Sequence, residues 1–321
     1  MKIYEAYRAG VEAGMKRDLR SKDEVQKILD DAKEDYESLP DDRKELYDLE
    51  RLWNPYADSR FSVGSEESKD KDAKCFMVGI DISPSEILLA DRLREKGKRI
   101  DAVMAHHPNG TSKTPFPEVM MQMTAMFEKQ GMPKDKAYEL VSKRMENVLR
   151  NMQGYNYNQT ADAARMLSIP FFNIHAPADN MVEEFMVNLI KDSNPRTLKD
   201  IIDVLFTLPE VRQAAKCNSP PIILVGNADD ECGQTMVKMN GGTSFSKETY
   251  EALAEAGVKT VVAMHYPEDH VEAAQKAGIN LIISGHMASD SVGVNLICDI
   301  WEKEGIEILA CSGFTRVSRN R

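Results

Sequence analysis

Five of the six histidines in this chain follow apolar, strand-like segments or lie in the turn after them. Three of these places carry a second side chain that can bind a metal ion: His106 with His107, His175 with Asp179, and His286 with Asp290. Imidazole and carboxylate groups together suit zinc, iron, manganese and nickel. Because sites in open α/β sheets form where strands end, three loops can bring these donors to one crevice. The pattern predicts a metal-binding protein, with two divalent ions of unknown identity as the favoured number.

The adjacent pair His106-His107 is the sharpest local signal, and it follows the strand-like segment 100–105. Neighbouring residues on a strand point to opposite faces, but a turn at the strand end lets both rings reach one cavity. Each ring would then serve one ion, and Pro108 makes the exit of the chain rigid. The alternative interpretation is a chance histidine pair in a turn.

The second pair, His286 and Asp290, has the spacing of one helical turn. If a helix begins here, both side chains lie on one face and can chelate an ion. Gly285 would allow close approach of the backbone. The competing interpretation is a surface histidine followed by an aspartate that caps a helix.

The third pair, His175 and Asp179, is interrupted by Pro177, so helical spacing is not assured. Asp179 has two carboxylate oxygens and could bridge two ions. His175 could be a ligand, a group that orients a ligand, or a general base. Alternatively, Asp179 caps a helix that begins at Asn180.

Two further features near strand ends are weaker. His265 also ends a strand-like segment and His270 follows an acidic pair, and surface positions are favoured for both over positions that line the site. The Gly241-Gly242-Thr243-Ser244 segment could present N–H groups to an anion. A plain turn is the favoured interpretation.

From residue 74 onward, short apolar segments alternate with helical patterns. Strands are expected near 75–80, 100–105, 170–174, 220–226, 235–240, 261–264, 281–284 and 306–311. This alternation predicts an α/β fold with a largely parallel or mixed sheet and helices on both faces. The expected organisation is an N-terminal helical extension and charged loop (1–70), a first α/β domain (71–192), a linker (193–219) and a second α/β domain (220–321).

Two helical blocks fall outside this alternation. Residues 1 to about 55 look polar and helical, with a capping box at Ser21 and Glu24, and an extension packed on a neighbouring element is favoured. The insertion at about 110–168 is rich in methionine. A methionine stripe at helical spacing is most often adaptable core, and a cover over the site or a subunit contact is the alternative.

Composition limits the function classes. The formal net charge of -11 argues against a broad nucleic-acid surface, which needs clustered Lys and Arg. The five cysteines are widely spaced without a C-x-x-C pair, which indicates free thiols in a reducing compartment. The start has no apolar signal core, and no apolar segment approaches membrane-spanning length. A cytoplasmic location is therefore expected.

Several motifs resemble those of the Nif-three-like proteins, also known as homologues of the type-two form of GTP cyclohydrolase one. They are Gly79-Ile-Asp-Ile-Ser83, Ala105-His-His-Pro108, His175-Ala-Pro-Ala-Asp179, the Gly241-Gly242 turn and Ser284-Gly-His-Met-Ala-Ser-Asp290. The segment 58–64 faintly resembles the family's opening motif. The match covers most of residues 75–110, 168–190 and 222–315.

The resemblance implies two similar three-layer α/β domains around a central cleft that holds two metal ions, and assembly into a ring-like hexamer. Carried over by motif, the metal ligands would be His106, His107, Asp179, His286 and Asp290, with His175 beside them. The family usually has Glu where Asp290 stands. Because Asp is one methylene shorter, bridging by Asp290 is an open question. The long helical insertion and the segment before Asp58 are also departures that can change substrate access or assembly.

Two functional hypotheses follow. The first is a metal-dependent hydrolase in which His175 transfers a proton, acting on a small molecule. A nucleotide, pterin-like or cyclic-amide substrate is implied by the resemblance alone. The second is a non-catalytic metal-binding scaffold, metal-handling protein or regulatory interaction partner. A third, structural interpretation is an α/β protein whose histidines only support the fold.

Overall fold

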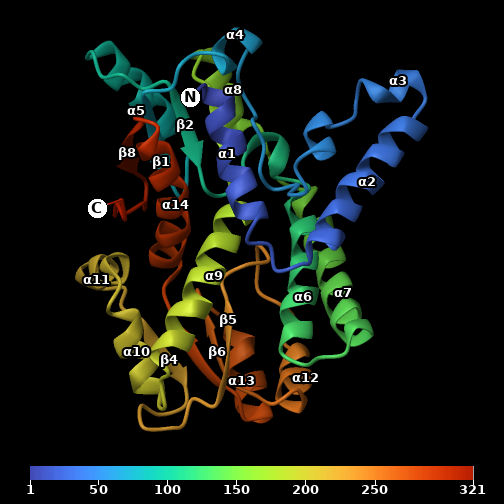
Figure 1. Cartoon of the computed structure of the whole chain (residues 1–321), viewed down its shortest axis with the longest axis vertical. Coiled ribbons are helices and arrows are strands. Elements are labelled where there is room, and N and C mark those ends of the chain that lie inside the picture. Colours follow the sequence, from blue (N-terminus) through green and yellow to red (C-terminus); the bar gives the residue numbers. More distant parts are fainter. Residues whose placement is uncertain (321) are drawn as a thin grey trace.

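The computed structural model describes residues 1–320, which form two four-stranded sheets connected by helices (Figure 1). The first sheet has the order β3-β2-β1-β8 and is parallel throughout; its strands are β1 (Cys75–Gly79), β2 (Ala102–Ala105), β3 (Phe171–Asn173) and β8 (Glu307–Cys311). The second has the order β4-β7-β6-β5; its strands are β4 (Ile222–Val225), β5 (Gln234–Lys238), β6 (Val258–Ala263) and β7 (Asn280–Ile283). Only β4 runs antiparallel to its neighbour. The predicted two-domain α/β architecture is confirmed.

The helices fall into four groups along the chain. The N-terminal segment contains α1 (Ile3–Met15), α2 (Lys22–Ser38), α3 (Asp41–Lys44), the 3-10 helix η1 (Leu49–Leu52) and α4 (Glu66–Lys69). The first β/α half contains α5 (Pro84–Glu95), and the insertion contains η2 (Gly110–Ser112), η3 (Phe116–Met121), α6 (Gln122–Lys129), α7 (Lys134–Met152) and α8 (Gln159–Met166). The rest are α9 (Ala176–Ser193), α10 (Leu198–Leu205), α11 (Pro209–Lys216), α12 (Thr249–Glu255), α13 (Glu268–Ala277) and α14 (His286–Lys303).

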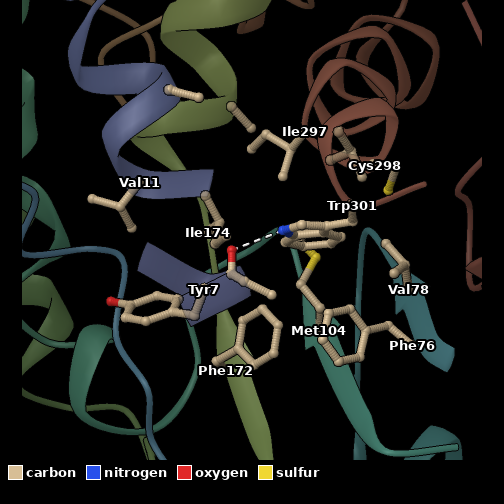
Figure 2. Packing of buried hydrophobic residues seen from close by; sticks show 14 of the residues in the cluster. Tyr7, Val11, Phe76, Val78, Met104, Phe172, Ile174, Ile297, Cys298 and Trp301 are labelled. Carbon is tan, nitrogen blue, oxygen red and sulfur yellow. Dashed lines mark hydrogen bonds between the residues drawn. The ribbon is translucent and has the colours of Figure 1, made fainter. Parts of the chain in front are cut away.

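The first helix is part of the core of the first domain. Ala6, Tyr7 and Val11 of α1 are fully buried. Figure 2 shows Trp301 of α14 beside Phe76 and Met104, with its indole Nε1 donating a hydrogen bond to the carbonyl oxygen of Ala6 at 2.7 Å. The expected packing of the N-terminal helices on a neighbouring element is confirmed for α1, whose apolar face closes the first domain. Helix α2, by contrast, buries only Val25 and leaves its polar face exposed.

The last strand also departs from the expected organisation. Strand β8 was expected within the second α/β domain, but it pairs with β1 at the edge of the first sheet, from Cys75 opposite Glu307 to Gly79 opposite Cys311. Helix α14 makes this return possible, because it begins directly after β7 of the second sheet and runs back to the first (Figure 1). The range 220–321 therefore does not describe one spatial unit.

The methionine-rich insertion is core, as favoured. Met120, Met123, Met126 and Met132 are buried in one cluster that includes Tyr250 and other apolar residues of the second domain. The insertion lies between β2 and β3 in the chain, yet its apolar side chains pack mainly on the second domain. It therefore holds the two halves of the molecule together.

Helices α9 and α14 cross at very short distance, and each carries part of the candidate site at its N-terminal end. Gly293 of α14 faces the backbone of Ala178 so closely that a Cβ atom on Gly293 would overlap the Ala178 carbonyl oxygen. Gly14 of α1 faces Pro177 of α9 in the same way. Glycine at these positions fixes the separation of the helices.

Within residues 1–320, none of the helices is both long enough and apolar enough to cross a membrane.

The Gly293→Ala substitution tests the helix crossing. Alanine normally stabilises a helix relative to glycine, but here its methyl group would overlap backbone, and overpacking of this kind costs roughly 1–3 kcal/mol. We expect a lower free energy of unfolding in a denaturant titration. Gly154→Ala is the control, because only the carbonyl oxygen of Asn151, 3.6 Å away, lies near a Cβ atom there. Unchanged stability of the Gly293→Ala variant would show that the crossing can widen without cost.

Candidate metal centre

The candidate site lies where strands of both sheets end. His106 and His107 follow β2, His175 follows β3 by two residues, and His286 follows β7 by three. Many of these side chains line a cleft of about 230 Å³ that also receives residues from β5 and the turn after it. The sheets thus place residues distant in sequence around one cavity, as the alternation of strands and helices predicted.

Asp290 lies at the centre of the site and is 1% exposed. Its Oδ1 atom lies 3.6 Å from His106 Nε2, while its Oδ2 atom lies 3.4 Å from His107 Nε2 and 3.3 Å from His286 Nε2. The two oxygens of one carboxylate therefore face different imidazoles. Helix α14 begins at His286, so Asp290 lies inside the helix and the capping interpretation is wrong.

Asp179 provides the second buried carboxylate. Its Oδ1 atom lies 3.4 Å from His106 Nε2, and its Oδ2 atom lies 3.8 Å from His175 Nε2. Helix α9 begins at Ala176, and Pro177 lies in its first turn. N–H groups in the first turn have no intrahelical acceptor, so proline, which has no N–H, is tolerated there. The alternative in which Asp179 caps a helix starting at Asn180 is therefore wrong.

Three of these imidazoles are oriented through their Nδ1 atoms. His106 Nδ1 is 3.0 Å from the carbonyl oxygen of Ile174, His107 Nδ1 is 2.7 Å from Asp81 Oδ1, and His175 Nδ1 is 2.6 Å from Asp58 Oδ2. When Nδ1 donates its proton, Nε2 of a neutral imidazole is left as the acceptor. This arrangement of a metal-binding imidazole held by an oxygen acceptor is common at metal sites.

Four atoms at the centre have no hydrogen-bond partner among residues 1–320, although they are buried. They are His106 Nε2, Asp179 Oδ1, and both Oδ1 and Oδ2 of Asp290. Buried polar atoms are almost always satisfied, and an unpaired buried carboxylate is costly. Two ligands bound at about 2.1 Å to a tetrahedral ion lie about 3.4 Å apart, which matches the separations in this cluster. The residues present therefore fit a metal ion.

The pKa values of the site residues follow from the same close approach of carboxylates and imidazoles. Burial alone would raise the pKa of Asp290, but His106, His107 and His286 hold it well below its usual range. Burial alone would lower the pKa of His106, yet Asp290 and Asp179 raise that pKa well above its usual value. Without a metal ion, a proton on His106 supplies part of the positive charge that the two carboxylates require.

The two remaining histidines, His265 and His270, lie in different surroundings. His265 lines the cleft, and its ring centroid lies 4.9 Å from that of His286, while the side chain remains exposed. Although the side chain is exposed, the neighbouring cleft residues partly desolvate the ring, and together with the charges of His286 and Lys238 this lowers the pKa of His265 to about 4. His270 lies away from the site, buried, with Nδ1 3.0 Å from the Tyr250 hydroxyl. The surface position expected for His270 is therefore wrong.

Sequence reasoning did not single out four residues of the site. Asp58 and Asp81 orient His175 and His107, and Lys113 and Lys238 line the cleft. Asp81 directly follows the strand-like segment 75–80 and lies within a motif already noted, so its position could have suggested a role. Nothing in the local pattern of the two lysines distinguishes them from surface lysines.

The chain resembles solved structures along most of its length. It shares 33% of residues with a NIF3 superfamily protein from Sphaerobacter thermophilus, over 90% of this chain and 98% of that one, with a TM-score of 0.71. Reduced HcgD from Methanocaldococcus jannaschii has the same type of fold at 14% identity, over 78% of this chain and 86% of that one, with a TM-score of 0.50. No protein-family model and no curated protein matches the chain.

The pH dependence of metal binding tests the arrangement of charges. Because the pKa of His106 is raised in the metal-free protein, His106 carries a proton near neutral pH that a metal ion must displace. We expect the affinity for Zn²⁺ to rise from about pH 6 to about pH 8, with proton release on binding. Titration calorimetry in buffers of different ionisation enthalpy measures both quantities. An affinity that does not change with pH would contradict the role of His106.

Proposed function

The chain belongs to the NIF3 superfamily, and from this premise we propose that it is a hydrolase that depends on two divalent metal ions held in the cleft. The observation that carries the proposal is the buried carboxylate of Asp290. Its two oxygens have no hydrogen-bond partner within residues 1–320, and they face different imidazoles. A carboxylate in this position can bind one ion through each oxygen.

Three sets of side chains could hold an ion; one is His106, His107 and His175, and the other two share Asp290. His106, Asp179 and Asp290 would hold one ion, and His107, His286 and Asp290 would hold the other. In each set the candidate ligand atoms lie within 4.8 Å of one another. We propose that Asp290 bridges the two ions. Because α14 begins at His286, Asp290 lies one helical turn inside the helix, and its side chain, although shorter than glutamate, reaches the centre of the cluster. His and Asp accept several metals, so the identity of the ions is not specified by these ligands.

Bound ions of this kind lower the pKa of water and polarise an oxygen of the substrate. The protein's own contribution to proton transfer would come from His175, which lines the cleft. Asp58 is fully buried and accepts from both the Nδ1 atom of His175 and the backbone N–H of Ala176. This contact holds the proton on Nδ1 and leaves Nε2 able to accept a proton, the arrangement required of a general base.

A non-catalytic metal-binding role is the second candidate. The observation in its favour is the size of the cleft, about 230 Å³, which is below the usual range of roughly 300–1,000 Å³ for small-molecule sites. Turnover assays on a panel of phosphoesters, nucleotides and cyclic amides distinguish the two functions. Hydrolysis by the metal-loaded protein favours the enzyme, whereas full activity after metal removal would overturn the proposal.

The Asp290→Asn substitution tests the metal site. The amide removes the charge and one acceptor oxygen at the centre of both ligand sets, so we expect most of the bound metal to be lost. Elemental analysis of protein purified without an affinity tag gives the metal content, and circular dichroism shows whether the fold is intact. Asp269→Asn, at an exposed position of α13, is the matched control and should retain its metal. Unchanged stoichiometry in Asp290→Asn would contradict the assignment.

The His175→Gln substitution separates proton transfer from metal binding. We expect kcat to fall by about 10²-fold or more while the metal content is retained, because general-base catalysis contributes about 10²–10⁴-fold. Loss of metal in His175→Gln would instead assign His175 as a ligand.

A further inference from the structure

Two lysines line the cleft without a carboxylate partner. Lys238 is the last residue of β5, and Lys113 lies between η2 and η3 in the insertion. Both side chains are partly buried, and neither forms an ion pair within 4.0 Å with any residue in 1–320. The Lys238 ammonium donates one hydrogen bond, to the carbonyl oxygen of Thr243 at 2.7 Å.

The surroundings make these two cations unfavourable on their own. Burial lowers the pKa of Lys238 to about 8, although Asp179 and Glu183 lie near enough to offset part of this effect. Burial also lowers the pKa of Lys113, with a smaller opposing effect of Asp81. A partly buried ammonium without a counter-ion costs free energy, and an anionic ligand would remove that cost.

The turn after β5 lines the same cavity. Gly242, Thr243 and Ser244 line the cleft, and Gly241 and Gly242 have φ values of +92° and +69°. No residue in 1–320 accepts a hydrogen bond from the backbone N–H of Gly242 or Ser244. The N–H of Thr243 between them donates to the carbonyl oxygen of Gly241 at 2.8 Å, so the turn has the N–H groups of Gly242 and Ser244 to offer to an anion. The hydrogen bond from Lys238 to Thr243 ties this turn to the lysine.

We propose that Lys113, Lys238 and the turn at residues 242–244 form a subsite for the phosphoryl group of a small phosphorylated substrate. Two ammonium groups match the double charge of a phosphate, and lysine binds phosphate as a point charge. The volume of about 230 Å³ restricts the enclosed part of the substrate to this group and a few further atoms. A nucleoside triphosphate would extend out of the cleft. The proposal rests on the metal-dependent function proposed above.

Titration calorimetry with inorganic phosphate tests the subsite. The proteins are the metal-loaded full chain and its Lys113→Met, Lys238→Met and Lys276→Met variants, the last at an exposed position on α13. Acetate is titrated in parallel as the carboxylate probe, and elemental analysis gives the metal content of each sample. We expect the Kd for phosphate to rise by about tenfold or more in each cleft variant, because a charged hydrogen bond is lost. Lys276→Met should match the parent protein.

The outcomes separate the subsite from the metal centre. Unchanged phosphate affinity in both cleft variants, with metal content intact, would overturn the subsite. Tighter binding of acetate than of phosphate would also overturn it, in favour of a carboxylate substrate. If the parent protein binds no metal, the proposed hydrolase fails, and the same phosphate titrations on metal-free protein still decide whether the lysines bind phosphate.

Discussion

The arrangement of this molecule depends on one buried negative charge. Asp290 is enclosed by three imidazoles, and both of its oxygens lack a hydrogen-bond partner within residues 1–320. A carboxylate in such surroundings is stable only if positive charge is supplied nearby. Protons on histidine can supply it, and so can metal ions. The geometry of the site therefore suits cations in either form.

The rest of the fold holds the groups that face Asp290 in place. Gly293 allows α14 to approach α9 closely, so Asp290 and Asp179 reach the same space from different helices. Backbone and carboxylate acceptors at Ile174, Asp81 and Asp58 fix the rings of His106, His107 and His175. The methionine-rich insertion packs against the second domain and carries Lys113 into the cleft. Precision at the centre thus comes from packing and hydrogen bonds supplied by several distant segments.

The sequence was most informative where the signal is local. The alternation of short apolar segments with helical patterns predicted all eight strands. The histidines at strand ends predicted the groups that the structure brings together. The spacing of His286 and Asp290 was interpretable because one helical turn separates them. For α9, Pro177 obscured the helix start, since proline disrupts a helix interior but is tolerated in the first turn.

The contributions that sequence reasoning missed are those that depend on contacts between distant segments. Asp58 contacts His175 across 117 positions in the chain, and no local pattern reports such a pair. The role of α1 in the core also depends on a partner near the other end of the chain, Trp301. Lys113 and Lys238 have ordinary local surroundings, and only the folded chain places both in one cleft.

The return of the chain to its first sheet affects how the protein can be made. The edge strand β8 and the Trp301 ring both belong to the first domain, yet both follow the whole second domain in the sequence. During translation, the N-terminal half therefore remains incomplete until synthesis has passed Cys311. Until then one edge of β1 is unpaired, and the apolar face of α1 lacks its contact with the Trp301 indole. Exposed surfaces of this kind are those that chaperones protect. The first half therefore completes its fold only after the second half has been synthesised.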